Sequence, residues 1–164
     1  MMIRNSARLL VAACFLMEAL PPGSVARTEE RLVWTEKASA GFVSLAYGPL
    51  DPAKSPLFLL SCFNAMSIAV LDVRTEMAEA KPGAALTIEL SAGDAKSPVK
   101  GEATRDDASG VTFGEASDIA VKPVLDVLRQ SGPLTVTVGE MSAALSDQGR
   151  AEAVDLFSQH CELD

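Results

Sequence analysis

Three cysteines and a single histidine are the residues of this 164-residue chain most able to do chemistry. A Ser-His-Asp or Cys-His catalytic site would have to use His160, which lies beside Cys161 near the C-terminus. The sequence contains no Gly-x-Ser-x-Gly motif, no dinucleotide fingerprint and no phosphate loop. One histidine also leaves too few soft or imidazole ligands for a zinc or copper site. The sequence therefore predicts a protein that is not an enzyme and needs no metal or other cofactor.

Cys62 and Cys161 are predicted to form a disulfide. Cys62 ends the apolar run LFLLSC and shares one face of an expected strand with Leu60, while Cys161 shares one face of an expected helix with Phe157. An even number of cysteines in an exported chain indicates pairing, because the compartment is oxidising. The bond would pin the last helix onto the strand. The alternative is two buried free thiols; a redox pair is not expected without a Cys-x-x-Cys motif.

Export is predicted from the N-terminus. The first eight residues carry two arginines, an apolar run follows as far as Met17, and the small residues Ser24 and Ala26 stand at positions −3 and −1 of a cleavage site. The apolar run is far shorter than the roughly 20 residues of a membrane span. We therefore expect a signal peptide over 1–26, one domain over 27–164, and a periplasmic or secreted location in a bacterium.

Cys14 supports a minor alternative for the same segment. Val11-Ala12-Ala13-Cys14 is similar to the motif of bacterial lipoproteins, in which the cysteine becomes the lipidated first residue. The apolar stretch between Arg8 and Cys14 is short for that purpose, which favours cleavage after Ala26. Lipidation would give a tethered protein without a membrane span.

The charge of the chain restricts its partners. The net charge is −8, and removal of Arg4, Arg8 and Glu18 with the signal peptide would take away +1 and leave −9. Nucleic acids and anionic membranes both require a basic patch, so neither is expected as a partner. A cationic protein would suit this charge, although solubility alone also explains it.

The remaining pattern is mostly alternation of apolar and polar residues, which is typical of strands. The region 92–98 is expected to be a turn and 99–104 a weak edge strand. Short strands separated by turns indicate a mostly β, or α+β, domain built as a β-sandwich or partly open barrel. The expected strands are 31–37, 41–48, 57–63, 66–73, 84–91, 99–104, 111–114 and 133–139.

Two segments have helical spacing instead. A helix is predicted near 122–131, with Pro123 in its first turn and Gly132 just beyond its end. The C-terminal helix is predicted near 149–161, capped by Ser146 or Asp147.

One loop is a candidate partner-binding surface. The run RDDASG places Asp106, Asp107, Ser109 and Gly110 together, and these residue types are typical of a turn. Its acids lack the spacing and closing glutamate of a calcium loop.

Several stretches together resemble exported proteobacterial proteins. These are the early Trp34, the run LFLLSC, the run GPLTVTVG, and the ending LSDQGRAEAVDLFSQHC, in which a residue of the pattern recurs every four positions up to Cys161. The pattern is similar to that of the type VI secretion accessory proteins TagO and VasI and of the invasion-associated locus B proteins. The resemblance implies a β-rich exported domain with bonded cysteines, and it carries over no functional residue.

A second resemblance concerns the RDDASG loop. Periplasmic inhibitors of c-type lysozyme are similar in being small, acidic, disulfide-bonded β-barrels with a Ser-Gly loop that enters the lysozyme cleft, which Ser109 and Gly110 would match. They lack a long C-terminal helix. The sequence thus predicts an exported, non-catalytic envelope protein with a binding or scaffolding role and an envelope protein as its partner. The alternatives are an inhibitor of a cationic enzyme such as c-type lysozyme and an accessory protein of a secretion system.

Overall fold

Nine strands form one antiparallel sheet in the computed structural model, which describes residues 30–77 and 79–163. Their order across the sheet is β1-β2-β3-β4-β7-β6-β5-β8-β9. The strands are β1 Leu32–Ser39, β2 Phe42–Pro49, β3 Phe58–Phe63, β4 Ile68–Val73, β5 Ala85–Ala92, β6 Ala95–Arg105, β7 Thr112–Ser117, β8 Leu134–Val138 and β9 Met141–Leu145. The helices are α1 Val121–Leu128 and α2 Arg150–His160, with a short 3-10 turn, η1, at Asn64–Met66.

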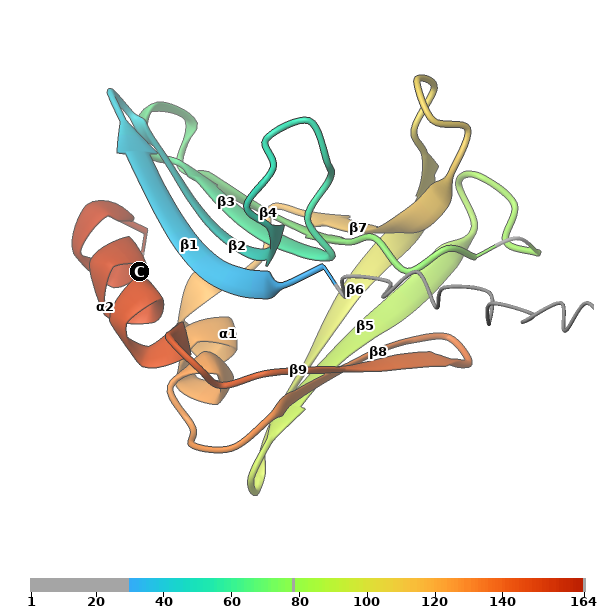
Figure 1. Ribbon diagram of the computed structural model, residues 1–164. Helices are drawn as coiled ribbons and strands as arrows, with labels where there is room; N and C mark the ends of the chain where they lie inside the picture. Colours follow the sequence, from blue (N-terminus) through green and yellow to red (C-terminus); the bar gives the residue numbers. More distant parts are fainter. Residues whose placement is uncertain (1–29, 78, 164) are drawn as a thin grey trace, which may run out of the picture.

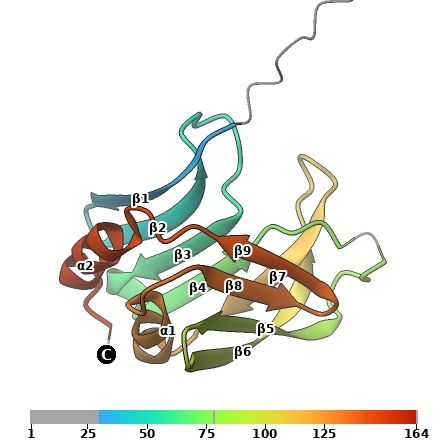
Figure 2. The ribbon, with the colours of Figure 1, turned by 60° about the horizontal axis from the view of Figure 1, so that its bottom comes forward.

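The sheet curls on itself, so that β1 to β4 form one wall and β5, β6, β8 and β9 form the other (Figure 1). Both helices lie at one end of these walls, which we call the helical end, and Figure 2 shows them there from a second direction. The β2–β3, β4–β5, β6–β7 and β8–β9 connections lie at the opposite end, which we call the loop end. This arrangement confirms the predicted mostly β fold with two helices.

The core lies between the two walls and is closed by the helices. Alternate residues of each strand point inward, as strand geometry requires, and those of β3 and β4 include Phe58, Leu60 and Leu71, which have no exposed surface. Ile88 and Leu90 of β5 face them from the opposite wall and are equally buried. Burying each such side chain stabilises the fold by about 1.5–3 kcal/mol.

Small inward residues mark β7, where one wall turns into the other. Gly114 is buried, and a Cβ atom placed on it would lie 3.0 Å from Cγ1 of Val138 on β8. Ala116, the next inward residue, is 1% exposed. The absence of large side chains here allows the two walls to approach each other.

The largest difference from the sequence prediction is in β6. The turn predicted over 92–98 is only Gly93 and Asp94, and the strand predicted as a weak edge at 99–104 is an 11-residue interior strand. Pro98 made the segment resemble a turn. It is tolerated because β7 pairs only with Glu102–Arg105, which leaves β6 a neighbour on one side at Pro98. Strand β9 was not predicted, since MSAAL has little alternation of apolar and polar residues.

Helix α1 buries the predicted apolar face, but it ends at Leu128, three residues before the predicted end at 131; Gly132, whose φ is +84°, lies in the turn that follows. The predicted cap of α2 is wrong, because the N-cap is Gly149 with φ +79°. Ser146 and Asp147 are engaged elsewhere. The Ser146 carbonyl accepts a hydrogen bond from Trp34 Nε1 at 2.6 Å, and Asp147 Oδ2 accepts one from the amide of Gly132 at 3.1 Å.

Arg150 joins the two helices at the helical end and is only 1% exposed. Its Nε donates to the carbonyl of Leu128 at 3.0 Å, and its Nη2 donates to the carbonyls of Gln130 and Gly132. These are carbonyls at the end of α1, where a cation is favoured. Burial lowers the pKa of the Arg150 guanidinium, and the nearby Asp147 carboxylate partly offsets this.

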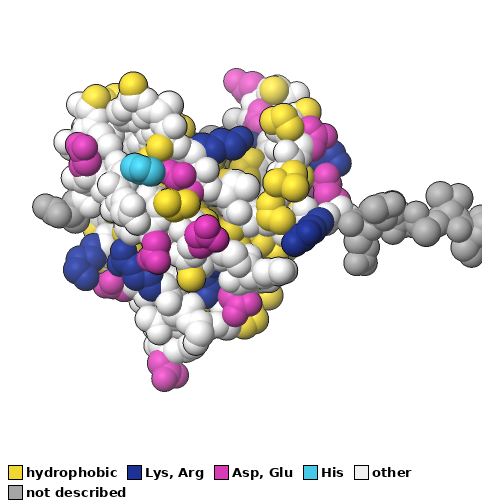
Figure 3. Space-filling model, turned by 60° about the vertical axis from the view of Figure 1, so that its left-hand side comes forward, with side chains coloured by type: hydrophobic (Ala, Val, Ile, Leu, Met, Phe, Trp, Pro, Cys, Tyr) yellow, Lys and Arg dark blue, Asp and Glu magenta, His cyan; other side chains and the backbone are white. Residues whose placement is uncertain are grey.

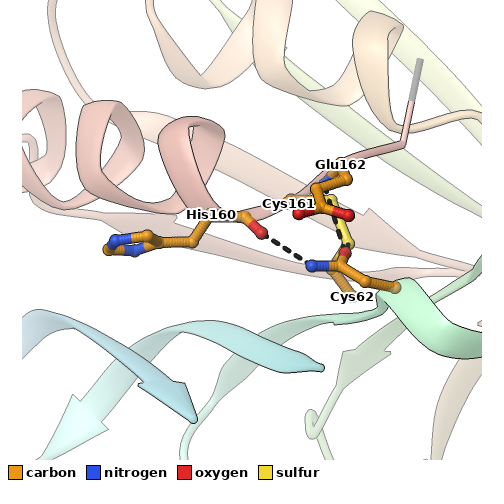
Figure 4. Close-up of a disulfide and its surroundings, with 5 residues drawn as sticks. Cys62, His160, Cys161 and Glu162 are labelled. Carbon is orange, nitrogen blue, oxygen red and sulfur yellow. Dashed lines mark hydrogen bonds between the residues drawn. A yellow bond between two sulfur atoms is a disulfide. The ribbon is translucent and has the colours of Figure 1, made fainter. Parts of the chain in front are cut away.

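The predicted disulfide between Cys62 and Cys161 is confirmed, with Cα atoms 5.8 Å apart (Figure 4). Cys62 is fully buried on β3, and Cys161 is the residue directly after α2. Asn64 holds the chain on both sides of the bond: its Nδ2 donates to the carbonyl of His160 at 2.8 Å, and its Oδ1 accepts from the amide of Glu162 at 3.1 Å. The C-terminal segment is thus fixed covalently to β3 and by hydrogen bonds to the β3–β4 connection.

Candidate functional site

A groove opens at the loop end between the β2–β3 connection and the β6–β7 loop. It encloses a cavity of about 380 Å³, which we call the loop-end groove. Its polar side chains include Arg74 and Ser109. Concave sites with apolar walls and a few polar groups are typical of ligand pockets. The apolar walls come from Leu32, Pro49, Pro56, Leu57 and Val111.

The β6–β7 loop beside the groove is held by Asp106. Its Oδ1 accepts hydrogen bonds from the amides of Ala108 at 2.9 Å and Ser109 at 3.3 Å, and its carbonyl accepts one from Gly110 at 2.7 Å. The hydrogen bonds that its carboxylate accepts, from the amide of Ala108 first and then from Arg74 and the amide of Ser109, lower the pKa of the Asp106 carboxyl. The predicted turn is confirmed. Asp106 serves the loop's own structure, and Asp107, Ala108 and Ser109 are exposed.

Arg74 connects this loop to the sheet. Its Nη1 lies 3.0 Å from Oδ2 of Asp106, and its guanidinium carbon lies 4.4 Å from the centre of the Phe113 ring on β7. Its Nη2 lies 4.0 Å from Oδ2 of Asp72 on β4. One cation is therefore shared by a loop carboxylate and a sheet carboxylate.

Asp72 lies on the outer face of the sheet with 14% of its side chain exposed. In the strand register it stands opposite Glu115 of β7, which stands opposite Glu102 of β6, so three carboxylates form a row across three strands. Oδ1 of Asp72 is buried and has no hydrogen-bond partner among residues 30–77 and 79–163. Burial, and then the charge of Glu115, raise the pKa of Asp72 to about 6, while Arg74 acts in the opposite direction. Perturbed carboxyls of this kind occur often at functional sites.

His160 is placed away from the groove, at the helical end. Its Nδ1 lies 2.8 Å from Oε1 of Glu36 on β1, and 47% of its side chain is exposed. The contact joins α2 to β1. Among residues 30–77 and 79–163, no three His, Cys, Asp or Glu side chains are grouped so that they could hold a metal ion.

Charges are mixed on the molecular surface. On the face drawn in Figure 3, acidic and basic side chains lie among neutral and hydrophobic ones, and neither sign forms a large patch. In the described part of the chain no helix is long and apolar enough to cross a membrane. The predicted signal peptide with its cleavage at Ala26, and the lipidation alternative at Cys14, lie outside the described residues.

Sequence reasoning found the loop but missed the two residues that tie it to the sheet. The alternation of MSIAVLDV indicates that Asp72 faces away from the core. Nothing in that pattern shows that its carboxylate is buried or that Arg74 reaches Asp106, 32 residues along the chain.

No family model, no curated protein and no solved structure matches this chain. The resemblances to secretion accessory proteins, invasion-associated proteins and lysozyme inhibitors therefore stay predictions.

Proposed function

We propose that this chain is an exported, non-catalytic binding protein of the bacterial envelope, whose loop-end groove takes an apolar segment of a partner protein. The observation that carries the proposal is the preordered β6–β7 loop standing beside apolar walls. A loop already held by Asp106 loses little conformational entropy on binding, which favours affinity. Leu50, 70% exposed on the adjoining connection, adds apolar surface that a partner could cover.

The export part of the proposal is supported by the Cys62–Cys161 disulfide, because such bonds persist in oxidising compartments. The intact mass of the protein recovered from cells tests it. A start at Arg27 supports a periplasmic or secreted chain, and an acylated start at Cys14 would make it a lipid-anchored one. An unprocessed start at Met1 would contradict export.

The groove is tested by capture of partners from envelope extracts. Leu32→Glu places a charge in the groove wall, and Leu156→Glu on α2 is the matched control, since the two leucines are 37% and 39% exposed. We expect a protein captured by the wild type and by Leu156→Glu to be lost with Leu32→Glu. If the two variants capture the same proteins, the groove is not the binding surface. A partner belonging to a secretion machinery would favour the accessory role that the first resemblance implies.

Inhibition of a cationic enzyme such as c-type lysozyme is the second candidate. The observation in its favour is that the β6–β7 loop projects from the loop end and exposes Asp107 and Ser109 (Figure 1). Purified protein in stoichiometric excess should then slow lysis in a lysozyme turbidity assay at low salt, and Asp107→Asn or Ser109→Ala should weaken the effect. Asp118→Asn, an exposed acid at the helical end, is the control. Undiminished lysis would exclude this candidate and leave the groove proposal standing.

A further inference from the structure

Arg74 lies between two carboxylates whose surroundings differ. Asp106 receives hydrogen bonds from the amides of Ala108 and Ser109 as well as from Arg74, so its charged form is favoured. Asp72 is more buried, and in the described part of the chain its Oδ1 has no hydrogen-bond partner. The two carboxylates therefore differ in how readily they bind a proton, although they share one guanidinium.

The strands on either side of Asp72 present different groups to it. On β7 it is opposite Glu115, beyond which Glu102 of β6 continues the row. On β3 it is opposite Leu59, and that strand presents no ionisable side chain to the outer face. Along its own segment of the chain, Oδ2 of Asp72 lies 4.0 Å from Nη2 of Arg74. Within the described residues, Asp72 thus has carboxylates on one flank and one cation within 4.0 Å, and together with its burial this favours its protonated form.

We propose that Asp72, Arg74 and Asp106 form a proton-operated latch on the β6–β7 loop. When both carboxylates are charged, Arg74 can pair with Asp72 after Asp106 moves away with the β6–β7 loop. The open state then keeps an ion pair, so opening costs less. When Asp72 binds a proton, Asp106 remains the carboxylate in contact with Arg74, and the loop is held more firmly. The latch rests on the proposed function in one respect: the loop it holds borders the groove in which the partner would bind.

The size of the effect follows from linkage. A full ion pair with Arg74 in the open state would lower the pKa of Asp72 by at least about one unit. Each unit of difference between the closed and open states changes the opening equilibrium about tenfold over the full titration. We therefore expect the open population of the loop to fall about five- to tenfold between pH 7.5 and pH 4.5, with its midpoint near the pKa of about 6.

Methyl relaxation dispersion at Ala108 and Val111 measures loop opening in the protein alone, and methyl groups do not exchange with water as pH changes. The wild type should show the fall in open population just described. Asp72→Asn should give the low, acid-type population at every pH. Glu115→Gln removes a charge that raises the pKa of Asp72, so it should move the midpoint to lower pH. Asp107→Asn, an exposed acid of the same loop, is the control and should leave the transition unchanged.

A wild-type loop whose open population does not change while the Asp72 carboxyl titrates would overturn the latch. A transition that persists unchanged in Asp72→Asn would do the same. If that variant does not fold, Glu115→Gln decides the matter, because an unmoved midpoint contradicts the proposal. The measurement needs no partner, so a failure of the latch leaves groove binding untouched, and a failure to find a partner leaves the latch untouched.

Discussion

Breaking the Cys62–Cys161 bond is expected to lower the free energy of unfolding by about 2–5 kcal/mol while the sheet stays folded. The two cysteines are 99 residues apart in the sequence. In the chain-entropy model, closing a loop of that length is worth about 4.7 kcal/mol at 25 °C. This value is near the upper end of the expected loss of 2–5 kcal/mol. The measured loss can be smaller, because the folded protein without the bond gains conformational freedom where the chain frays after α2.

The structure also indicates which part of the protein loosens first when the disulfide is broken. Val154 and Phe157 of α2 have no exposed surface, so the body of the helix stays packed without the bond. The segment 161–163 and the last helical turn depend more on the disulfide and on the two hydrogen bonds of Asn64. Loss of the bond should therefore increase amide exchange there before it affects the strands.

Urea unfolding followed by far-UV circular dichroism and by fluorescence of Trp34, the single tryptophan, measures the loss. Three samples are compared: the oxidised protein, the reduced protein, and the double variant Cys62→Ala/Cys161→Ala. The reduced protein keeps the buried sulfur of Cys62, so its difference from the double variant isolates the small cavity that alanine leaves. The reasoning fails if the reduced protein, with both thiols verified as free, is within about 0.5 kcal/mol of the oxidised one.

Two further predictions concern buried charges. Arg150→Met should lower the free energy of unfolding in urea by about 1–3 kcal/mol, because the buried carbonyl of Leu128 loses its donor. Arg129→Met, which removes an exposed i,i+3 pair on α1, should change the same free energy by less than about 1 kcal/mol. Equal effects would contradict the role of Arg150. Asp72 has a folded pKa raised from 3.8 to about 6, so the native state binds more protons between those values and its stability falls as pH rises through them. Asp72→Asn should therefore gain up to about 3 kcal/mol relative to wild type between pH 4 and pH 7.5, at 1.36 kcal/mol per pKa unit. A gain that does not change with pH would show that the charge of Asp72 is not the cause.

Strand prediction succeeded where one face of a strand is apolar and failed where small or special residues break the pattern. β2, β5 and β8 alternate clearly, β3 and β4 are short apolar runs, and all five were found close to their observed bounds. β6 buries Ser97 and Ala103 and contains Pro98, so its sequence resembled a turn and an edge. The length and interior position of β6 depend on its pairing with β5 and β7, and the alternation of apolar and polar residues in its sequence carries no information about that pairing.

The sequence by itself determined the β-rich fold, the two helices and the pairing of Cys62 with Cys161. These follow from side-chain period and from the even number of cysteines that remains once the predicted signal peptide is set aside, both of which can be read locally. Only the tertiary structure decided that Arg150 binds the end of α1 and that Arg74 is shared by Asp72 and Asp106. The physical reason is that these contacts form between segments up to 32 residues apart, and the burial that gives Asp72 its raised pKa exists only when β4 and β7 lie side by side.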